Sequence, residues 1–324
     1  MILLIIIAAA AAADGNVPLT GQPVDSNKFE TVRTYINAWL TKLSPGMALI
    51  SASHLKDSIV DAWDKKRNEF QIVSVRTPDD YKNAGHIAHA INIYWAEIAA
   101  DESLVQLDSN KNIILYCYFG HGSMIASTIL SLLGYRCQSL NFGMMGWNLD
   151  AMVKAPWDKE ADYEVETAPN EPEESFLAPV IAGNETDARS IIKKMARKYL
   201  GGEGSPVILS SDVKAIVDDW NKKRTEYQIV DVRSRADYTK GHIPHSINIL
   251  WTAVAEKNNL EKLDPDKTSI LYSENGQTGQ LATTVLSLLG YRAVDMKFGM
   301  MDWNKSCVDT SAQWNAAMAY PVEF

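Results

Sequence analysis

Two stretches of the sequence share one frame and differ at a position that could act as a nucleophile. The first, NIILYCYFGHGSMIASTILSLLGYR at residues 112–136, places Cys117 between a strand-forming run and a run with helical periodicity. The second, TSILYSENGQTGQLATTVLSLLGYR at residues 268–292, has Ser273 in the same place. A thiolate is a strong nucleophile at neutral pH, whereas a serine hydroxyl needs an adjacent base. We therefore expect the first stretch to react and the second to be a catalytically silent copy.

The loop after Cys117 has the composition of an anion-binding loop. It consists of Tyr118, Phe119, Gly120, His121, Gly122 and Ser123. Its two glycines tolerate the dihedral angles that fold backbone N–H groups inward, and the following helix presents the positive end of its dipole. Such a position favours the thiolate form of a cysteine. A buried, inert cysteine is the alternative, but the strand, glycine loop and helix around Cys117 favour a reactive one.

Other histidines and tryptophans can be assigned a functional or a structural role according to whether they occur in both repeats. His121 has no counterpart; it could assist anion binding when protonated, but we expect it to point to solvent. His86 and His242 recur in both halves, including the half without the cysteine, so we predict that they are structural. Trp147 and Trp303 recur likewise, and we predict that they pack in the core or between domains.

The duplication extends over most of the chain and predicts two domains. IVDAWDKKRNEFQIVSVRTPDDYKNAGHIAHAINIYW pairs with IVDDWNKKRTEYQIVDVRSRADYTKGHIPHSINILW, and LLGYRCQSLNFGMMGWN pairs with LLGYRAVDMKFGMMDWN. We assign residues 17–165 to the first domain and residues 181–324 to the second. The stretch between them, residues 166–180, reads as a linker because its prolines prevent a continuous helix.

Within each repeat, short strand signals alternate with helical signals. FQIVSVR and NIILYC are short apolar runs typical of buried strands. In SMIASTILSLLGYR, the residues Ile125, Ile129 and Leu132 fall on one helical face, and Gly134 stands where a C-terminal cap belongs. This alternation predicts an α/β fold in which each domain is a parallel sheet with helices on both faces. Ligands of such sheets bind outside the carboxyl ends of the strands, where Cys117 lies.

Composition and charge narrow the functional classes. The 324 residues are 46% hydrophobic and carry a net charge of −9, which argues against a nucleic-acid partner because phosphate contacts need a positive surface. The three cysteines are too few for a disulfide framework, although a Cys137–Cys307 pair stays open. No Cys/His set has the spacing of metal ligands, and we expect no cofactor. The oligomeric state is not predicted.

The first residues suggest an exported protein. MILLIIIAAAAAA, residues 1–13, has the apolar run and small residues of a secretory signal peptide, which would place the mature chain in the periplasm. As a helix this run would be too short to span a bilayer. No lysine or arginine precedes it, so a cytoplasmic protein is the alternative.

Taken together, the motifs resemble those of the rhodanese family of thiosulfate and mercaptopyruvate sulfurtransferases. DYKNAGHIAHAINI and DYTKGHIPHSINI resemble the amino-terminal signature of that family, and FGMMGWN and FGMMDWN resemble its carboxyl-terminal signature. CYFGHGS resembles its six-residue active loop with a leading cysteine. Each motif is moderately specific, but they occur in order and twice. The resemblance implies two tandem rhodanese-like domains, with the first active and the second inactive.

The resemblance also implies a mechanism and a set of partners. The Cys117 thiolate would take the outer sulfur of a small anionic donor such as thiosulfate and pass it, as a persulfide, to cyanide or a thiol. Residues 118–123 would form the substrate-binding loop, and Arg76 matches the family's arginine that reaches toward the anion. The alternative for Arg76 is an ordinary structural ion pair.

Three departures from the family pattern bear on this reading. The cysteine is in the amino-terminal rather than the carboxyl-terminal domain, Ser74 replaces the aspartate that the second half keeps as Asp231, and the loop has no lysine or arginine. The related dual-specificity phosphatases and arsenate reductases need a loop that ends in arginine, whereas this one ends in Gly122 and Ser123, which makes phosphatase activity improbable. A protein that carries sulfur or a selenium anion to a partner without turnover is the remaining alternative.

Overall fold

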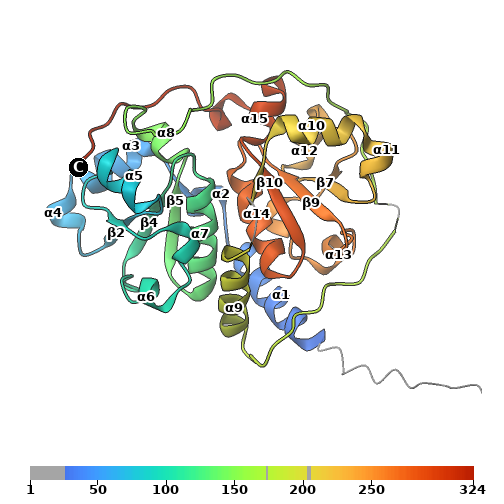
Figure 1. Ribbon diagram of the computed structural model, residues 1–324, viewed down its shortest axis with the longest axis horizontal. Coiled ribbons are helices and arrows are strands. Elements are labelled where there is room, and N and C mark those ends of the chain that lie inside the picture. The colour runs from blue at the N-terminus through green and yellow to red at the C-terminus, as the bar shows by residue number, and fades with distance from the viewer. Residues whose placement is uncertain (1–25, 173, 203–205) are drawn as a thin grey trace, which may run out of the picture.

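The computed structural model describes residues 26–172, 174–202 and 206–324, which form two similar halves side by side (Figure 1). The predicted signal peptide at residues 1–13 lies outside these ranges. Within them, no helix is both long enough and apolar enough to cross a membrane. Cys117, Cys137 and Cys307 are all free thiols, so the pairing left open by the sequence is absent from the structure.

The first half contains one sheet and a series of mostly short helices. Its elements are α1 (Ser26–Leu40), α2 (Pro45–Ala48), β1 (Leu49–Ile50), α3 (Ala52–Leu55), the π-helix η1 (Lys56–Val60), α4 (Trp63–Lys66), β2 (Phe70–Ser74), α5 (Pro78–Asn83), β3 (Ile91–Asn92), the 3-10 helix η2 (Trp95–Glu97), α6 (Asp101–Leu104), β4 (Asn112–Tyr116), α7 (His121–Leu133), β5 (Arg136–Leu140) and α8 (Gly143–Trp147). Gly134 caps α7 in the left-handed conformation, as predicted, and α7 begins at His121, slightly earlier than the sequence suggested.

The second half repeats this order. Its elements are α9 (Ala188–Leu200), β6 (Val207–Ile208), α10 (Ser210–Asp218), α11 (Trp220–Lys223), β7 (Tyr227–Asp231), α12 (Arg235–Lys240), β8 (Ile247–Asn248), the 3-10 helix η3 (Trp251–Ala253), α13 (Lys257–Leu260), β9 (Thr268–Tyr272), α14 (Gln277–Leu288), β10 (Arg292–Met296), α15 (Gly299–Trp303), and the 3-10 helices η4 (Lys305–Cys307) and η5 (Thr310–Ala312).

Both sheets are parallel, as predicted. The strand orders are β1-β5-β4-β2-β3 and β6-β10-β9-β7-β8, and every pairing between these strands is parallel. β4 is therefore the central strand of the first sheet and β9 that of the second. Because Cys117 and Ser273 directly follow these strands, both loops open at the carboxyl edge of a sheet, where ligands of parallel sheets bind.

Successive residues of the central strand β4 point to opposite faces of the sheet, and each face is covered by helices. Ile113 and Leu115 join a hydrophobic cluster that contains α7, whereas Ile114 and Tyr116 join a second cluster on the other face with α3 and α8. Both faces are thus removed from water, which is why NIILY is a continuous apolar run rather than an alternating one. The prediction of helices on both faces is confirmed.

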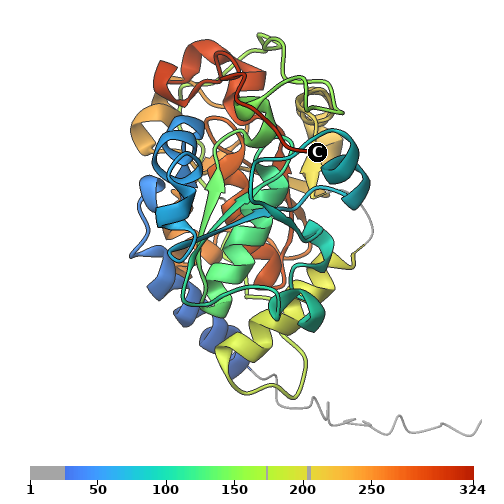
Figure 2. The same ribbon diagram turned by 90° about the vertical axis from the view of Figure 1, so that its left-hand side faces the viewer.

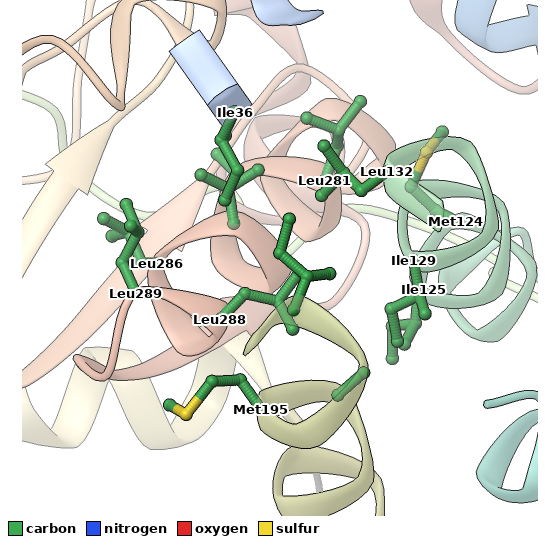
Figure 3. Close-up of a cluster of buried hydrophobic side chains, with 14 of the residues drawn as sticks. Ile36, Met124, Ile125, Ile129, Leu132, Met195, Leu281, Leu286, Leu288 and Leu289 are labelled. Carbon is green, nitrogen blue, oxygen red and sulfur yellow. The ribbon is translucent and has the colours of Figure 1, made fainter. Parts of the chain in front are cut away.

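One hydrophobic core joins the two halves. Side chains from α7 and α14 pack against each other, and side chains from α1 and α9 close the same cluster (Figure 3). Ile36 from α1, Ile125 from α7 and Leu281 from α14 are each 1% exposed or less. The helices that follow the two loops therefore form the domain interface, and burial of this apolar layer fixes the loops relative to each other.

Two extended segments, which we call the crossing straps, exchange between the halves. Residues 161–166 leave the first half and bind the end of α15, where Tyr163 N–H donates to Trp303 O at 2.9 Å. Residues 318–323 leave the second half and bind the end of α8, where Tyr320 N–H donates to Trp147 O at 3.0 Å. The C-terminal strap runs back over the first half in both views (Figures 1 and 2). In space, residues 161–165 thus belong with the second domain, although the sequence division placed them in the first.

The recurring tryptophans and histidines are structural, as predicted. Trp147 and Trp303 are fully buried, and each donates its Nε1–H to a carbonyl of the crossing strap beside it, Pro321 and Glu164 respectively. His86 stacks on a tyrosine ring at 4.0 Å between centroids, and His242 does so at 3.7 Å.

Candidate active site

Cys117 lies at the point where β4 ends and the loop to α7 begins. Its side chain is buried, with only 5% of the residue exposed. The Gly120 N–H donates to Cys117 Sγ at 3.2 Å, and the Ser123 hydroxyl lies 3.6 Å from the same sulfur. The sulfur therefore faces donors at the N-terminal end of the 13-residue helix α7, an arrangement that stabilises negative charge on sulfur.

The loop backbone is fixed by the start of α8. Met144 N–H donates to Cys117 O and Met145 N–H to Tyr118 O, both at 2.9 Å. Gly120 supplies the left-handed turn at the start of α7 with φ 101°. At Gly143, a Cβ atom would lie 2.5 Å from Cys117 O, so only glycine allows this approach. The FGMM sequence, which both repeats share, thus holds the cysteine loop in place through these contacts.

Two further contacts define the floor of the loop. Ser123 Oγ and Ser139 Oγ on β5 are 2.8 Å apart, and Ser123 Oγ also lies 3.1 Å from Gly120 O. A Cβ atom on Gly122 would lie 3.7 Å from both Cys117 Sγ and the Trp95 ring, so the indole lies close to the sulfur. An apolar ring on one side and hydroxyls on the other leave little room for bulk solvent.

The two aromatic residues after the cysteine form the rim of the loop and turn toward different halves. The Tyr118 hydroxyl donates to the Asp80 carboxylate at the start of α5. Burial would raise the pKa of Asp80, but the hydrogen bonds from Tyr118 and Thr77 outweigh it and hold that pKa below its ordinary value. The same burial and the bond to Asp80 raise the pKa of Tyr118 to about 12. Tyr118 is therefore neutral and acts as a hydrogen-bond donor.

Phe119 faces the second half. Its ring packs edge-on against Phe298 with centroids 5.5 Å apart. Both belong to a small cluster with Phe142, Met145 and Trp157 that lies between the two halves. The cysteine loop of the first half thus packs against side chains of the second half.

His121 is buried in the interface, so the prediction that it points to solvent is wrong. It is 5% exposed, and its Nε2 atom accepts from Phe298 N–H at 3.4 Å and lies 3.4 Å from an oxygen of Asp295. Burial lowers the pKa of His121 to about 3, and the nearby Lys297 adds to this shift. Burial also raises the pKa of Asp295 well above its ordinary value. Both groups therefore favour their uncharged forms, and we describe the contact as a neutral pair rather than an ion pair.

Arg76 has a structural position and no exposed surface. It is fully buried and donates to the carbonyls of Gly85 and Ala151. Its counterpart Arg233 makes the equivalent bonds and in addition pairs with Asp231 at 2.6 Å. Because Ser74 replaces that aspartate in the first half, Arg76 keeps the carbonyl contacts without the ion pair. We therefore reassign Arg76 from donor binding to support of the loops around α5.

The loop of the second half has the same backbone and different chemistry. Gly276 N–H donates to Ser273 Oγ at 3.1 Å, as Gly120 does to the sulfur. Asp295 occupies the place of Ser139, and Gly279 leaves room for it because a Cβ atom there would collide with the carboxyl group. Glu274 stands where the first half has Tyr118, and burial raises its pKa. Buried acids beside Ser273 disfavour an anionic ligand.

Comparison with known proteins identifies the two halves. Residues 58–150 and residues 212–306 each match the family described as Rhodanese-like domain, and together they cover more than half of the chain. The chain belongs to the rhodanese family. Each match contains four of the five strands of one sheet, and Cys117 and Ser273 lie in the equivalent loops of the two domains.

Relatives of the rhodanese-like domains are named as sulfurtransferases. The putative sulfurtransferase YtwF of Bacillus subtilis is 30% identical over 78 residues, which are 24% of this chain and 74% of that protein. The adenylyltransferase and sulfurtransferase UBA4 of Meyerozyma guilliermondii is 32% identical over 114 residues, which are 33% of this chain but only 27% of that protein. The match thus spans about a quarter of the longer relative.

Two solved structures are also similar to the chain. A thiosulfate sulfurtransferase from Pseudomonas aeruginosa is 15% identical, with a TM-score of 0.30 and coverage of 90% of this chain and 49% of that one. The 3-mercaptopyruvate sulfotransferase SseA from Escherichia coli is 17% identical, with a TM-score of 0.28 and coverage of 76% and 97%.

The structure adds residues to the site that the motif comparison missed. Trp95 and Asp80 come from the segments around α5 and η2, and Lys154 and Lys297 approach the rim of the rhodanese loop from outside it. Lys297 replaces Asn141 of the first repeat within otherwise similar stretches, so a comparison of the two repeats could have identified it as a difference near the site. The sequence around Lys154 contains no comparable indication. Within the described residues, no group of three or more His, Cys, Asp or Glu is placed to hold a metal ion.

Proposed function

We propose that this protein is a sulfurtransferase that carries sulfane sulfur as a persulfide on Cys117. The thiolate attacks the outer sulfur of thiosulfate or a similar donor, the donor's S–S bond breaks, and sulfite leaves with the electron pair. The product is an anionic cysteine persulfide. A nucleophile such as cyanide or a thiolate then attacks the outer sulfur, and the Cys117 thiolate leaves, ready for the next donor.

One observation carries this proposal: the sulfur of Cys117 lies 3.2 Å from the Gly120 N–H at the N-terminus of α7. A fixed backbone donor stabilises the thiolate before the reaction, and the same loop can stabilise the persulfide anion afterwards without reorganising. The hydroxyl of Ser123 adds a second polar group on the other side of the loop. The sulfurtransferase names of the matched relatives agree with this assignment.

The low exposure of Cys117 favours a small donor. Only 5% of Cys117 is exposed. A small molecule can approach so buried a sulfur atom more readily than a folded protein can. The same burial supports one alternative, a carrier that holds a persulfide and releases it slowly to a partner without useful turnover.

Steady-state transfer from thiosulfate to cyanide separates the two functions. We expect the wild type to form thiocyanate continuously and the Cys117→Ser variant to form none above the uncatalysed rate. A wild type that forms a stable persulfide but no thiocyanate would favour the carrier. Absence of both products would contradict both functions.

A further inference from the structure

A lysine from each half stands at the rim of the cysteine loop. Lys297 directly follows β10 of the second half, and its Nζ atom lies 4.3 Å from the centroid of the Phe119 ring. Lys154 follows α8 of the first half, and its Nζ atom lies 4.8 Å from the centroid of the Tyr118 ring. Because Tyr118 and Phe119 are the two residues after Cys117, both cations lie against side chains of the cysteine loop.

Neither cation is neutralised by a direct partner. Within the described ranges, no carboxylate lies within ion-pair distance of Lys154 or Lys297. Asp302 acts on Lys297 from farther away and accepts from Trp157 and Ser210, and Asp80 acts on Lys154 and accepts from Tyr118. Burial lowers the pKa of Lys297, Asp302 opposes this shift, and the positive charge of Lys154 adds to it. Two like charges that disfavour each other would gain from an anion bound between them.

The loop needs these cations because it supplies none. The chain as a whole carries a net charge of −9, so its long-range field repels an anion. His121 is the only basic side chain within residues 117–123, and its lowered pKa keeps it neutral. Any charged side chain that attracts an anionic donor must therefore come from outside the loop, in addition to the loop N–H groups and the dipole of α7.

The second loop lacks the equivalent cation at the interface. Glu274 and Asn275 replace Tyr118 and Phe119. Asn141 is the counterpart of Lys297 in the first half, so the residue that approaches the second loop from across the interface is an asparagine. Asn141 instead accepts from the side-chain amide of Gln277. The cysteine loop therefore has a lysine from the opposite half beside it, whereas the second loop has neither the cysteine nor the lysine.

We propose that Lys297, with Lys154, binds the negatively charged end of the sulfur donor, so that the half without a cysteine supplies a donor-binding residue to the half with one. This inference rests on the proposed function and assigns the residues that recognise the negative charge of the donor. The anionic group lies between the two ammonium groups while the outer sulfur faces Cys117. The second half is then retained for a contribution to binding as well as for packing.

Two alkylating reagents test this inference without any sulfur transfer. Iodoacetate and iodoacetamide both alkylate a thiolate and release iodide, but only iodoacetate is an anion. We expect Lys297→Met to lower the rate constant for iodoacetate at Cys117 about fivefold, with a smaller drop for Lys154→Met, because one nearby charge is lost. The rate for iodoacetamide should stay within about twofold, since the methionine keeps the aliphatic packing on Phe119.

Matched variants give the controls. Lys223→Met removes the same charge from a distant helix of the second half and should change neither rate, and Lys297→Arg should preserve the preference for iodoacetate. Unchanged iodoacetate rates in Lys297→Met, or a wild type in which Cys117 resists both reagents, would overturn the inference. A fivefold loss for iodoacetate in a protein that never forms a persulfide would support the anion site while the proposed function fails. Wild-type thiosulfate loading of Lys297→Met together with unchanged alkylation would leave the function standing and overturn the inference.

Discussion

At the scale of single residues, the two loops differ in a few side chains on nearly the same backbone. Cys117 and Ser273 each accept from a glycine N–H at the start of a helix. The difference in chemistry therefore comes from the atoms placed on this backbone and from the charges around them. Asp295 is the clearest example, because its fully buried carboxyl group lies beside the serine loop and contacts His121 of the cysteine loop.

We predict that Asp295→Asn stabilises the protein at neutral pH. Neither carboxyl oxygen of Asp295 has a hydrogen-bond partner among the described residues, and the group facing it, His121, is neutral. The folded-state pKa of Asp295 lies above the ordinary value of 3.8. Ionisation of this carboxyl group therefore favours the unfolded chain. The stability that the protonated group contributes below about pH 4 is lost as the pH rises. The amide should add about 1–3 kcal/mol to the free energy of unfolding near pH 8 and little below pH 4.

Urea denaturation across this pH range measures the effect, and Asp231→Asn is its control. Asp231 is equally buried but pairs with Arg233 at 2.6 Å, so its replacement should destabilise the protein by about 3 kcal/mol. An Asp295→Asn variant that is less stable than the wild type near pH 8 would show that the carboxylate is charged and stabilising.

The sequence could predict where the cysteine loop lies but not the state of its neighbours. The positions of Cys117 and Ser273 after the central strands could be inferred because residue type and spacing are visible in the two repeats. The burial of His121 could not, because it depends on Phe298 and Asp295, more than 170 residues away in the chain. Local patterns carry no information about which surface of a loop meets another domain.

At the scale of elements, the site is a strand, a glycine loop and a helix N-terminus clamped by a second short helix. α8 begins at Gly143 and ties back to the carbonyls of Cys117 and Tyr118. The amphipathic pattern of α7, its glycine cap and the central position of β4 were all predictable from periodicity. The contact of α8 with the cysteine loop was not predictable, because nothing in the FGMM sequence indicates which segment it will contact.

We predict that Gly143→Ala and Gly299→Ala have similar effects on stability and different effects on reactivity. A Cβ atom at Gly143 would meet Cys117 O at 2.5 Å, and one at Gly299 would meet Ser273 O, and both residues have positive φ. Each change should cost about 2 kcal/mol or more, because backbone atoms must move. Only Gly143→Ala should slow persulfide formation, since only it displaces the reactive loop.

Thermal unfolding and thiosulfate loading of the two variants test this prediction together. Comparable losses of persulfide formation in both variants would mean that the effect is general destabilisation. Unchanged loading in Gly143→Ala would show that the clamp does not position Cys117.

At the scale of the whole molecule, the two rhodanese-like domains are joined by a shared core and by the crossing straps. They share the core around α7 and α14, and the crossing straps tie each domain to the end of the other repeat. The duplication predicted two domains but not this exchange, because a strap such as residues 161–166 has the same sequence character whichever half it binds.

We predict that the protein unfolds in a single cooperative transition. Separation of the halves would expose the shared apolar layer and release both straps, so neither half should persist alone. Tryptophan fluorescence and far-UV circular dichroism should give coincident denaturation midpoints. The variant Tyr320→Ala, which loosens one strap from Trp147, should lower the single midpoint rather than split it. Two resolved transitions would show that the halves are independent.

The most direct test of the account is the intact mass of the protein after brief exposure to thiosulfate and removal of excess donor. We predict that the wild type gains the mass of one sulfur atom, that cyanide removes it, and that Cys137→Ser and Cys307→Ser behave like the wild type. Cys117→Ser should gain nothing, and addition of Ser273→Cys to it should not restore the gain, because Glu274 and Asp295 surround that position. A sulfur adduct on any residue other than Cys117, or an unmodified wild type, would contradict the assignment of Cys117 as the sulfur carrier.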